Sequence, residues 1–365
     1  MPTTRDINKL IIHTSFLDIM GIFDLLPHLP GGKCYHQDFY ELQMGKNVVP
    51  MDAAGLLWQC ALIHATEFLR GNLLPALIEW AQHLNYFRSI CEWKMRLYLD
   101  GMDNPNKEFE NERRRLRRES AEHEHGRIKN TPEYLAQAAW IANNVLKIPC
   151  FISKEEADPH VAYEAVSKGL VPVTGDSDLI AYGVVKAIIV KSYSRGWYRI
   201  IDLQVDTEPG DYPLYDLYKL YGVIVFQLYA GCRGCDFTKE ESGIKGIGYT
   251  NFMLIASVVE GDLDARSFSR AMWSYDNTKK IAIDNGMESA EEVESYLQRV
   301  VNIYSEATIY DEDSNSISMK GVKVGEATEV SRQHMAGLVD TKTQDPHSEE
   351  VMDKMKNLER QQLLP

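Results

Sequence analysis

The sequence lacks an excess of positive charge, a long apolar run and a rich set of cysteines. Its 39 Lys and Arg against 53 Asp and Glu give a formal net charge of −14, which argues against a protein that coats nucleic acid with its whole surface. No apolar run reaches the roughly 20 residues of a membrane span, so we expect no membrane partner. No secretory-signal pattern is recognised, and six scattered cysteines then indicate a reducing intracellular compartment rather than a disulfide framework.

A zinc site is also not expected. Cys232 and Cys235 form a Cys-x-x-Cys motif, but a structural zinc ion needs two more ligands and the sequence has no second such pair. His123 and His125 stand in a charged stretch, which favours exposure to solvent over metal binding.

What the sequence does contain is a series of short apolar runs that each lead to a carboxylate. The runs 48–51, 97–99, 148–152 and 170–173 are followed by Asp52, Asp100, Glu156 and Asp176. Such runs, bounded by polar or turn residues, are typical of buried parallel strands. Open α/β sheets bind ligands in the crevice at the carboxyl ends of their strands, so these acids should meet at one edge. Clustered carboxylates repel one another unless hard divalent cations lie between them, so the sequence predicts a Mg²⁺ or Mn²⁺ site.

Helical patterns alternate with these runs over 53–70, 75–92 and 133–146. This order predicts an α/β fold in which crossover helices flank a mostly parallel twisted sheet. Further along, the patterns predict a strand over 197–203, a helix over 215–229, helices within 263–306 and a hairpin over 307–317.

A polar, charge-dense segment over 107–130 interrupts the alternation, with five arginines at positions 113–118. Lys107 and Arg114 are seven residues apart, so they share one face of a helix. Arg suits a bidentate grip on phosphate and Lys a point charge. A solvated helix face with acids nearby would explain the run as well.

The acids beyond the strands also have plain structural explanations. Asp176 and Asp178 would share one face of a strand end, but Asp is also common in turns. Glu156 and Asp158 precede a proline at a helix start, where capping explains one acid but not the group. Asp236 precedes the glycine-rich stretch 243–248, where the backbone could approach a phosphate, although an ordinary turn between helices would look the same.

Taken in order, six motifs resemble those of the XPG and flap endonuclease family, and within it the exonuclease 1 group. They are Met20-Gly21-Ile22-Phe23-Asp24, Val48-Val49-Pro50-Met51-Asp52, Leu99-Asp100-Gly101, Glu156-Ala157-Asp158, Gly175-Asp176-Ser177-Asp178-Leu179-Ile180-Ala181-Tyr182-Gly183, and Gly234-Cys235-Asp236-Phe237 with Gly246-Ile247-Gly248. The resemblance implies a PIN-like core, a helical arch and a helix-two-turn-helix DNA-binding module. The arch would be shortened, because the chain between the second and third acids is shorter than in exonuclease 1.

The resemblance also implies the site residues. The metal ligands would be Asp52, Asp100, Glu156, Asp158, Asp176, Asp178 and Asp236, holding two Mg²⁺ ions, or Mn²⁺ in their place. The catalytic groups would be Lys107 and Arg114, which contact the scissile phosphate at the base of the arch, together with Asp176 and Asp178. The DNA-binding positions would be Gly21, Trp58, Arg113, Arg117, Gly243, Lys245, Gly246 and Gly248, with K⁺ as an optional ion at the helix-two-turn-helix.

The implied activity is structure-specific cleavage of DNA from a 5′ end by two-metal-ion hydrolysis, as a 5′–3′ exonuclease, a 5′-flap endonuclease or both, in repair, replication or recombination. The partner would be a DNA duplex with a 5′ end, nick or flap. We expect a monomer in the nucleus, with the mitochondrion as the alternative. The tail has no sliding-clamp motif.

On this interpretation the chain has six parts. They are an N-terminal extension (1–19), a first nuclease region (20–125) with the arch segment (104–130), a second nuclease region (131–230), the helix-two-turn-helix module (231–290), a return to the core (291–325) and a polar tail expected to be disordered (326–365).

Two alternatives stay open. A catalytically weak or inactive family member that serves as a nucleic-acid or protein-binding scaffold would fit the short arch and the acidic balance, but not the complete set of acids. A magnesium-dependent phosphatase with Asp-x-Asp chemistry would need a second acid after Asp52, where the chain has Ala53-Ala54.

Overall fold

The computed structural model describes residues 21–31, 35–36, 48–89, 91–101, 105–121, 123–153, 155–193, 197–240, 242–310, 316–318 and 353. The predicted extension 1–19 lies outside these ranges, as does the predicted tail 326–365 apart from residue 353. Within the described part, no helix combines the length and the apolar character that crossing a lipid bilayer requires.

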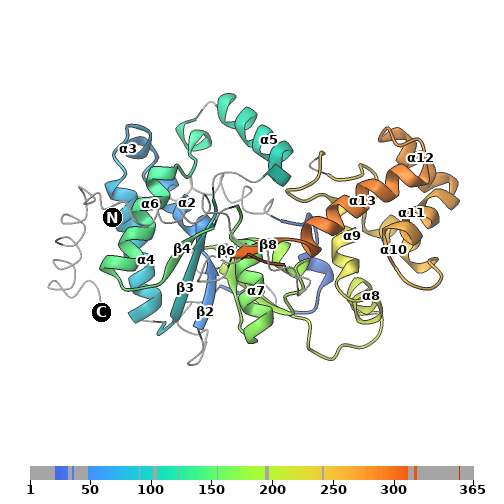
Figure 1. Ribbon diagram of the computed structural model, residues 1–365, viewed down its shortest axis with the longest axis horizontal. Helices are drawn as coiled ribbons and strands as arrows, with labels where there is room; N and C mark the ends of the chain where they lie inside the picture. Colours follow the sequence, from blue (N-terminus) through green and yellow to red (C-terminus); the bar gives the residue numbers. More distant parts are fainter. Residues whose placement is uncertain are drawn as a thin grey trace.

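A seven-stranded sheet forms the centre of the molecule (Figure 1), with the strand order β1-β7-β6-β5-β2-β3-β4. Its strands are β1 (Tyr35–His36), β2 (Val48–Asp52), β3 (Lys94–Leu99), β4 (Cys150–Ile152), β5 (Val173–Thr174), β6 (Lys186–Ser192) and β7 (Trp197–Asp202). Neighbours from β6 to β4 run parallel, whereas β7 is antiparallel to β6 and β1 to β7. The predicted mostly parallel α/β sheet is confirmed. The predicted hairpin is the antiparallel pair β8 (Thr308–Tyr310) and β9 (Ser316–Ser318).

Helices cover both faces of the sheet. They are α2 (Ala54–Ile63), α3 (Ala65–Leu69), α4 (Leu74–Ser89), α5 (Glu108–Glu119), α6 (Pro132–Trp140), α7 (Asp158–Lys168), α8 (Pro213–Tyr221), α9 (Ile224–Arg233), α10 (Tyr249–Ser257), α11 (Ala265–Ser274), α12 (Asp276–Asp284) and α13 (Ala290–Ser305). Two helices predicted to be continuous are interrupted. The first breaks at His64, and the second at Gly222, whose φ of +75° cannot continue a right-handed helix.

Successive residues of β6 show how the two faces are filled. Ala187 and Ile189 pack into one core with α7 to α13, whereas Ile188 and Val190 pack into a second core with α2, α4 and α6. Side chains alternate between the faces of a strand, so a continuous apolar strand is what two buried faces require.

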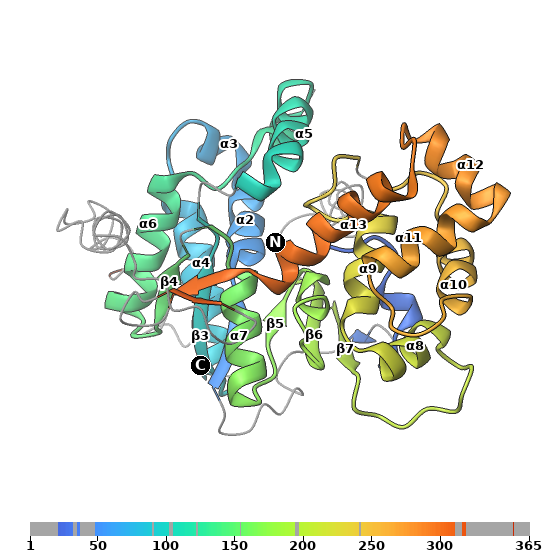
Figure 2. The same cartoon turned by 45° about the vertical axis from the view of Figure 1, so that its right-hand side comes forward.

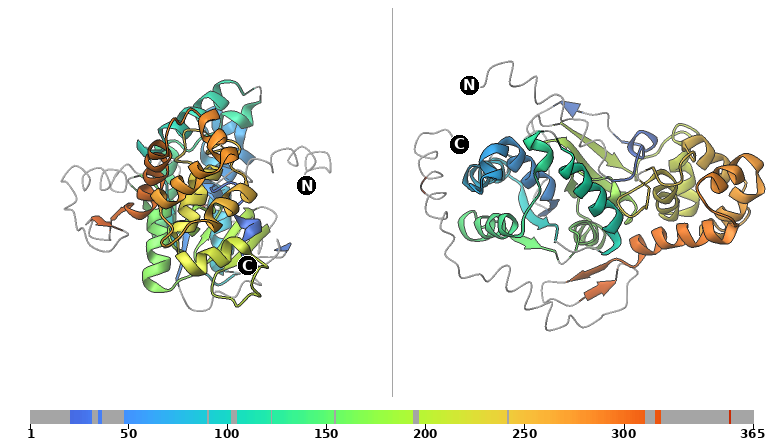
Figure 3. Two further views of the ribbon diagram at one scale, coloured as in Figure 1. Left: turned by 90° about the vertical axis from the view of Figure 1, so that its right-hand side faces the viewer. Right: turned by 90° about the horizontal axis from the view of Figure 1, so that it is seen from above.

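Helix α5 lies apart from both cores, above the sheet (Figure 1). Seen from above, it lies between the part of the chain with α2 and α6 and the group formed by α8 to α13 (Figure 3). Helix α13 then leads back to β8, which lies beside α7 (Figure 2). Residues from the C-terminal part of the described chain therefore return to the central sheet.

Candidate active site

The seven predicted metal ligands all lie where an element of the core ends or begins. Asp52 is the last residue of β2, and Asp100 follows β3. Glu156 and Asp158 stand at the start of α7, Asp176 and Asp178 follow β5, and Asp236 follows α9. Electrostatic interactions connect all seven carboxylates, so the structure brings them together in one cluster, hereafter the acid cluster.

Hydrogen bonds hold the carboxylates of Asp52 and Asp100 in place. Asp52 accepts from the Ala54 amide at 3.1 Å and from the Thr174 hydroxyl at 3.0 Å. Asp100 accepts from the Ala157 amide at 2.9 Å, which ties the end of β3 to the start of α7. Each acid retains lone pairs for a further ligand, because an ionised carboxylate accepts at both oxygens.

Other oxygens of the cluster are buried without any hydrogen bond. Asp158 Oδ1 and both carboxylate oxygens of Asp178 have none, and the nearby Tyr304 hydroxyl lies outside hydrogen-bond geometry. Asp176 is better supported, since its Oδ1 accepts from the Asp178 amide at 2.8 Å. Buried polar atoms nearly always have a partner, so these unpaired oxygens are suited to be ligands of a hard cation.

Burial is the main cause of strong pKa shifts in the cluster, and repulsion between neighbouring carboxylates adds to it. The pKa of Asp52 is raised to about 8 and that of Asp176 to about 6. The pKa of Glu156 is raised to about 7 even though Lys107 partly offsets the effect of burial. Those of Asp158 and Asp178 are raised well above their usual values. A bound cation would reverse this balance by stabilising the ionised forms.

In this structure, the two predicted phosphate-contacting residues bind the acids themselves. Lys107 Nζ lies 2.5 Å from Glu156 Oε2 and 2.8 Å from Asp236 Oδ2, and Arg114 Nη2 lies 2.9 Å from that same Asp236 oxygen. Burial alone would raise the pKa of Asp236, but the charges of Lys107 and Arg114 hold it below its usual range. The same acids hold the pKa of the buried Lys107 well above its usual value, so its ammonium stays charged.

This pairing decides how a metal could enter. Within the residues that the structure describes, no three His, Cys, Asp or Glu side chains have the arrangement of a metal site. The donor set suits Mg²⁺, but Lys107 is the cation that now contacts Glu156 and Asp236. Binding of two ions would therefore require Lys107 to move away from these two acids.

The predicted DNA-binding arginines of α5 also have protein contacts. Arg113 Nη1 donates to the carbonyl oxygens of Thr238 at 3.0 Å and Lys239 at 2.7 Å, and its other nitrogens bind Glu110. Arg117 is about one third exposed, with Nη2 3.9 Å from the same carboxylate. Arg113 thus attaches α5 to the loop after Asp236 in this structure, and its contact with DNA stays a prediction.

The remaining predicted DNA-binding positions are Gly21, Trp58 and residues of the loop over 243–248. Gly21 lies against Asp176, with a φ of +86°. Trp58 is half-buried, and its indole donates to the Ile128 carbonyl at 3.4 Å.

Asn285, directly after α12, holds the loop over 243–248 by two hydrogen bonds. The backbone amide of Lys245 donates to the side chain of Asn285 at 2.9 Å, and the Asn285 amide donates back to the Lys245 carbonyl at 2.8 Å. Gly243 and Gly246 have φ values of +63° and +104°, which favour glycine, whereas Gly248 has an ordinary φ.

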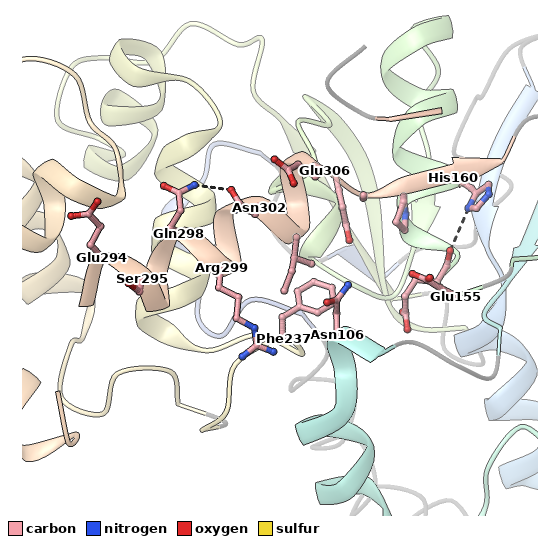
Figure 4. Close-up of a pocket in the computed structure, with 15 residues that line it drawn as sticks. Asn106, Glu155, His160, Phe237, Glu294, Ser295, Gln298, Arg299, Asn302 and Glu306 are labelled. Atoms are coloured by element: carbon pink, nitrogen blue, oxygen red, sulfur yellow. Dashed lines mark hydrogen bonds between the residues drawn. The ribbon is translucent and has the colours of Figure 1, made fainter. Parts of the chain in front are cut away.

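A cavity of about 680 Å³ borders the acid cluster and shares Glu156 with it. Its wall also includes Asn106, just before α5, and Phe237, just after Asp236. Figure 4 shows Arg299 pointing from α13 toward Phe237 and the start of α5. The Arg299 guanidinium lies 5.6 Å from the ring centre of Phe109, so α13 also contacts α5.

Sequence analysis missed Glu110 and Arg299. Glu110 carried a usable signal, because it stands three and four residues before Arg113 and Arg114 and so shares their face of the helix. Arg299 carried none, since its contact with Phe109 joins residues 190 positions apart.

Known proteins resemble this chain in structure but not detectably in sequence. No protein-family model matches the chain, and no curated protein sequence does. Among solved structures, the catalytic core of Rad2 in complex with DNA substrate matches with a TM-score of 0.54 and 15% identity, over 92% of this chain and 100% of that chain. A second Rad2 complex with DNA gives 0.53 and 15%, over 90% and 96%. Human GEN1 in complex with Holliday junction DNA gives 0.51 and 15%, over 87% and 72%.

The chain has the XPG and flap endonuclease fold. The resemblance drawn from the sequence motifs is thereby confirmed for the architecture. In this XPG-type fold, the acid cluster lies at the carboxyl edge of the sheet, and α5 lies within 104–130, the segment predicted to form the arch.

The acid cluster should make the metal-free protein less stable as the pH rises. A carboxyl group whose pKa is raised by folding contributes stability below its unfolded pKa and loses it as the pH passes through the folded value. For Asp52 and Asp176 this window runs from about pH 4 to about pH 8. Asp236, with its lowered pKa, titrates below the window. We expect the Tm in EDTA to fall between pH 5.5 and pH 8, and millimolar Mg²⁺ to restore it at pH 8.

Asp52→Asn provides the control for this prediction. It removes a carboxyl group whose pKa burial raises to about 8, so its Tm should depend less on pH than that of the wild type. An equal dependence in both proteins would show that other groups cause the effect.

Proposed function

We propose that this chain is a divalent-metal-dependent nuclease that cleaves DNA at or near a 5′ end, with selectivity for the structure of the substrate. A single observation carries the proposal: a buried acid cluster with bare carboxylate oxygens lies in the XPG and flap endonuclease fold. Mutually repelling buried acids cost stability, so a protein is expected to keep them only where a cation binds. The Rad2 and GEN1 structures with this fold contain DNA, which supports DNA as the substrate class.

Each group of the site would have its own role. Two divalent ions, when bound, would supply an activated water and a stabilised leaving oxygen. Asp158, Asp176 and Asp178 would provide most of the ligands to the ions, since Asp158 and Asp178 have carboxylate oxygens without a hydrogen bond. Lys107 and Arg114, released from the acids, would neutralise the charge on the phosphate. The backbone of the 243–248 loop would hold the duplex without reading its bases.

A direct assay tests the proposal. The protein is incubated with Mg²⁺ or Mn²⁺ and 5′-end-labelled DNA in three forms: blunt duplex, nicked duplex and duplex with a 5′ flap. Release of mononucleotides would identify an exonuclease, and release of the intact flap a flap endonuclease. No cleavage of any substrate with either ion would refute the nuclease assignment. Nuclear localisation is part of the proposal, and imaging of the tagged full-length chain tests it separately.

Arg114→Ala is expected to slow turnover more than it weakens binding of duplex. An arginine that contacts the scissile phosphate acts on the transition state, so kcat should fall by about tenfold or more while Kd changes by about threefold or less. Single-turnover cleavage and fluorescence anisotropy of a labelled duplex measure the two quantities. Equal losses in both would make Arg114 a general electrostatic contact.

The scaffold alternative also has a specific observation in its favour. Lys107 and Arg114 neutralise Glu156 and Asp236 within the protein, which lessens the need for a metal at these two acids. A scaffold would bind flap or nicked DNA equally well with EDTA and with Mg²⁺, and would cleave neither.

A further inference from the structure

The attachment of α5 depends on one buried carboxylate. Glu110 is 6% exposed, and it is the one buried residue of α5. Its Oε2 accepts from Arg113 Nε at 2.8 Å, and its Oε1 accepts from Arg114 Nε at 2.6 Å. Glu110 therefore holds Arg113 by Nε and Nη2 and Arg114 by Nε, and Arg113 Nη1 and Arg114 Nη2 point onward.

The outer nitrogens reach the loop that follows α9. Arg114 Nη2 contacts the Asp236 carboxylate at 2.9 Å, and Arg113 Nη1 contacts the carbonyl oxygens of Thr238 and Lys239. The two arginines thus connect one face of α5 to Asp236, Thr238 and Lys239. Charge-assisted hydrogen bonds of this kind are strong, and the rigid planar guanidinium fixes the directions of its other N–H groups once one of them is held.

We propose that Glu110 is a positioning residue, which sets the direction of Arg114 and fastens α5 to the loop after Asp236 through Arg113. The inference rests on the proposed function and adds to it the group that aims the phosphate-contacting arginine. Glu110 itself touches no substrate. When Arg114 turns from Asp236 to a phosphate, its Nε keeps the hydrogen bond to Glu110. Only the partner of Nη2 changes, from the Asp236 carboxylate to the phosphate.

The same helix offers a matched control. Glu112 pairs with Arg115 at 2.6 Å, but both side chains are about half exposed. An exposed ion pair contributes little to stability or position. Glu110→Gln and Glu112→Gln are therefore the same chemical change at a buried and at an exposed position of α5.

The test compares these two variants with the wild type by steady-state kinetics and by hydrogen exchange of the backbone amides over 108–119. For Glu110→Gln we expect kcat to fall by about tenfold or more while KM stays within about threefold, because the loss affects the aim of Arg114 rather than duplex binding. Amides of α5 should exchange faster. Glu112→Gln should match the wild type in all three measurements.

Arg113→Gln separates the two parts of the proposal. It removes the contacts with Thr238 and Lys239 but keeps Arg114 on Glu110. Exchange over 108–119 should therefore rise as in Glu110→Gln, while kcat falls less. The Tm of each variant shows whether the fold is retained.

Three results would overturn the inference. They are identical kcat and exchange in the Glu110 and Glu112 variants, a rise in KM at unchanged kcat in Glu110→Gln, and unchanged exchange over 108–119 in both Glu110→Gln and Arg113→Gln. If the wild type cleaves no substrate, the proposed function fails instead, and the exchange measurement still decides whether Glu110 fastens α5.

Discussion

Asp176→Ala should abolish Mg²⁺-dependent cleavage of DNA while the protein remains folded. Asp176 is buried at the carboxyl end of β5 and interacts with Asp158, Asp178 and Asp236. Even the loss of a group that only supports a metal ligand commonly costs ten- to a hundredfold in affinity or activity. Removal of a ligand should cost more, and we expect a loss of more than about a hundredfold in the rate of product formation.

A second substitution at this position separates charge from shape. Asp176→Asn retains an oxygen that can accept the hydrogen bond from the Asp178 amide, but it lacks the negative charge. Its cleavage should be lost to nearly the same extent. Its Tm in EDTA at pH 8 should be higher than that of the wild type, because one member of a repelling buried cluster has become neutral.

The exposed Asp284, at the end of α12, provides the control. Asp284→Ala should cleave DNA at the wild-type rate. Cleavage by Asp176→Ala at a rate close to that of this control would remove Asp176 from the metal site and leave the nuclease proposal without its central ligand.

The sheet and the positions of the acids could be predicted because both follow from local patterns. An apolar run that ends in an acid is visible in five or six residues, and parallel strands necessarily place their carboxyl ends at one edge. Even β5, with two residues, was predictable from the apolar residues before Asp176. The break at Gly222 was not, because a glycine within a helical pattern is compatible with either one helix or two until its φ is known.

The contacts of the charged residues could not be predicted from the sequence. The heptad spacing placed Lys107 and Arg114 on one face of α5, but it did not show what that face approaches. Lys107 meets Glu156 across 49 positions and Arg114 meets Asp236 across 122, and only the arrangement of α5 above the sheet brings them together. The sequence did not distinguish Glu110 from the other acids of this helix, because burial of a helix face depends on its neighbour and not on its own composition.

Gly21 has a steric role beside the acid cluster. Its φ is +86°, and a Cβ atom added there would lie 2.1 Å from Asp176 Oδ1 and 2.4 Å from Ser177 Oγ. It would also lie 2.7 Å from the Ser177 backbone nitrogen, so rotation of the two side chains cannot relieve the collision. Gly21 therefore allows the chain to pass directly against the acid at the end of β5.

Gly21→Ala is expected to reduce cleavage by more than about a hundredfold, because Asp176 must move from its position among the other ligands. The free energy of unfolding should fall by about 2–4 kcal/mol, the sum of a collision in a packed site and an alanine at positive φ. Gly71→Ala is the matched control, since Gly71 has a φ of +84° but no atom within 4 Å of an added Cβ. It shares the backbone strain without the collision, so it should lose some stability and no activity. If Gly21→Ala cleaves DNA as fast as Gly71→Ala, the close approach of Gly21 to Asp176 has no bearing on the reaction.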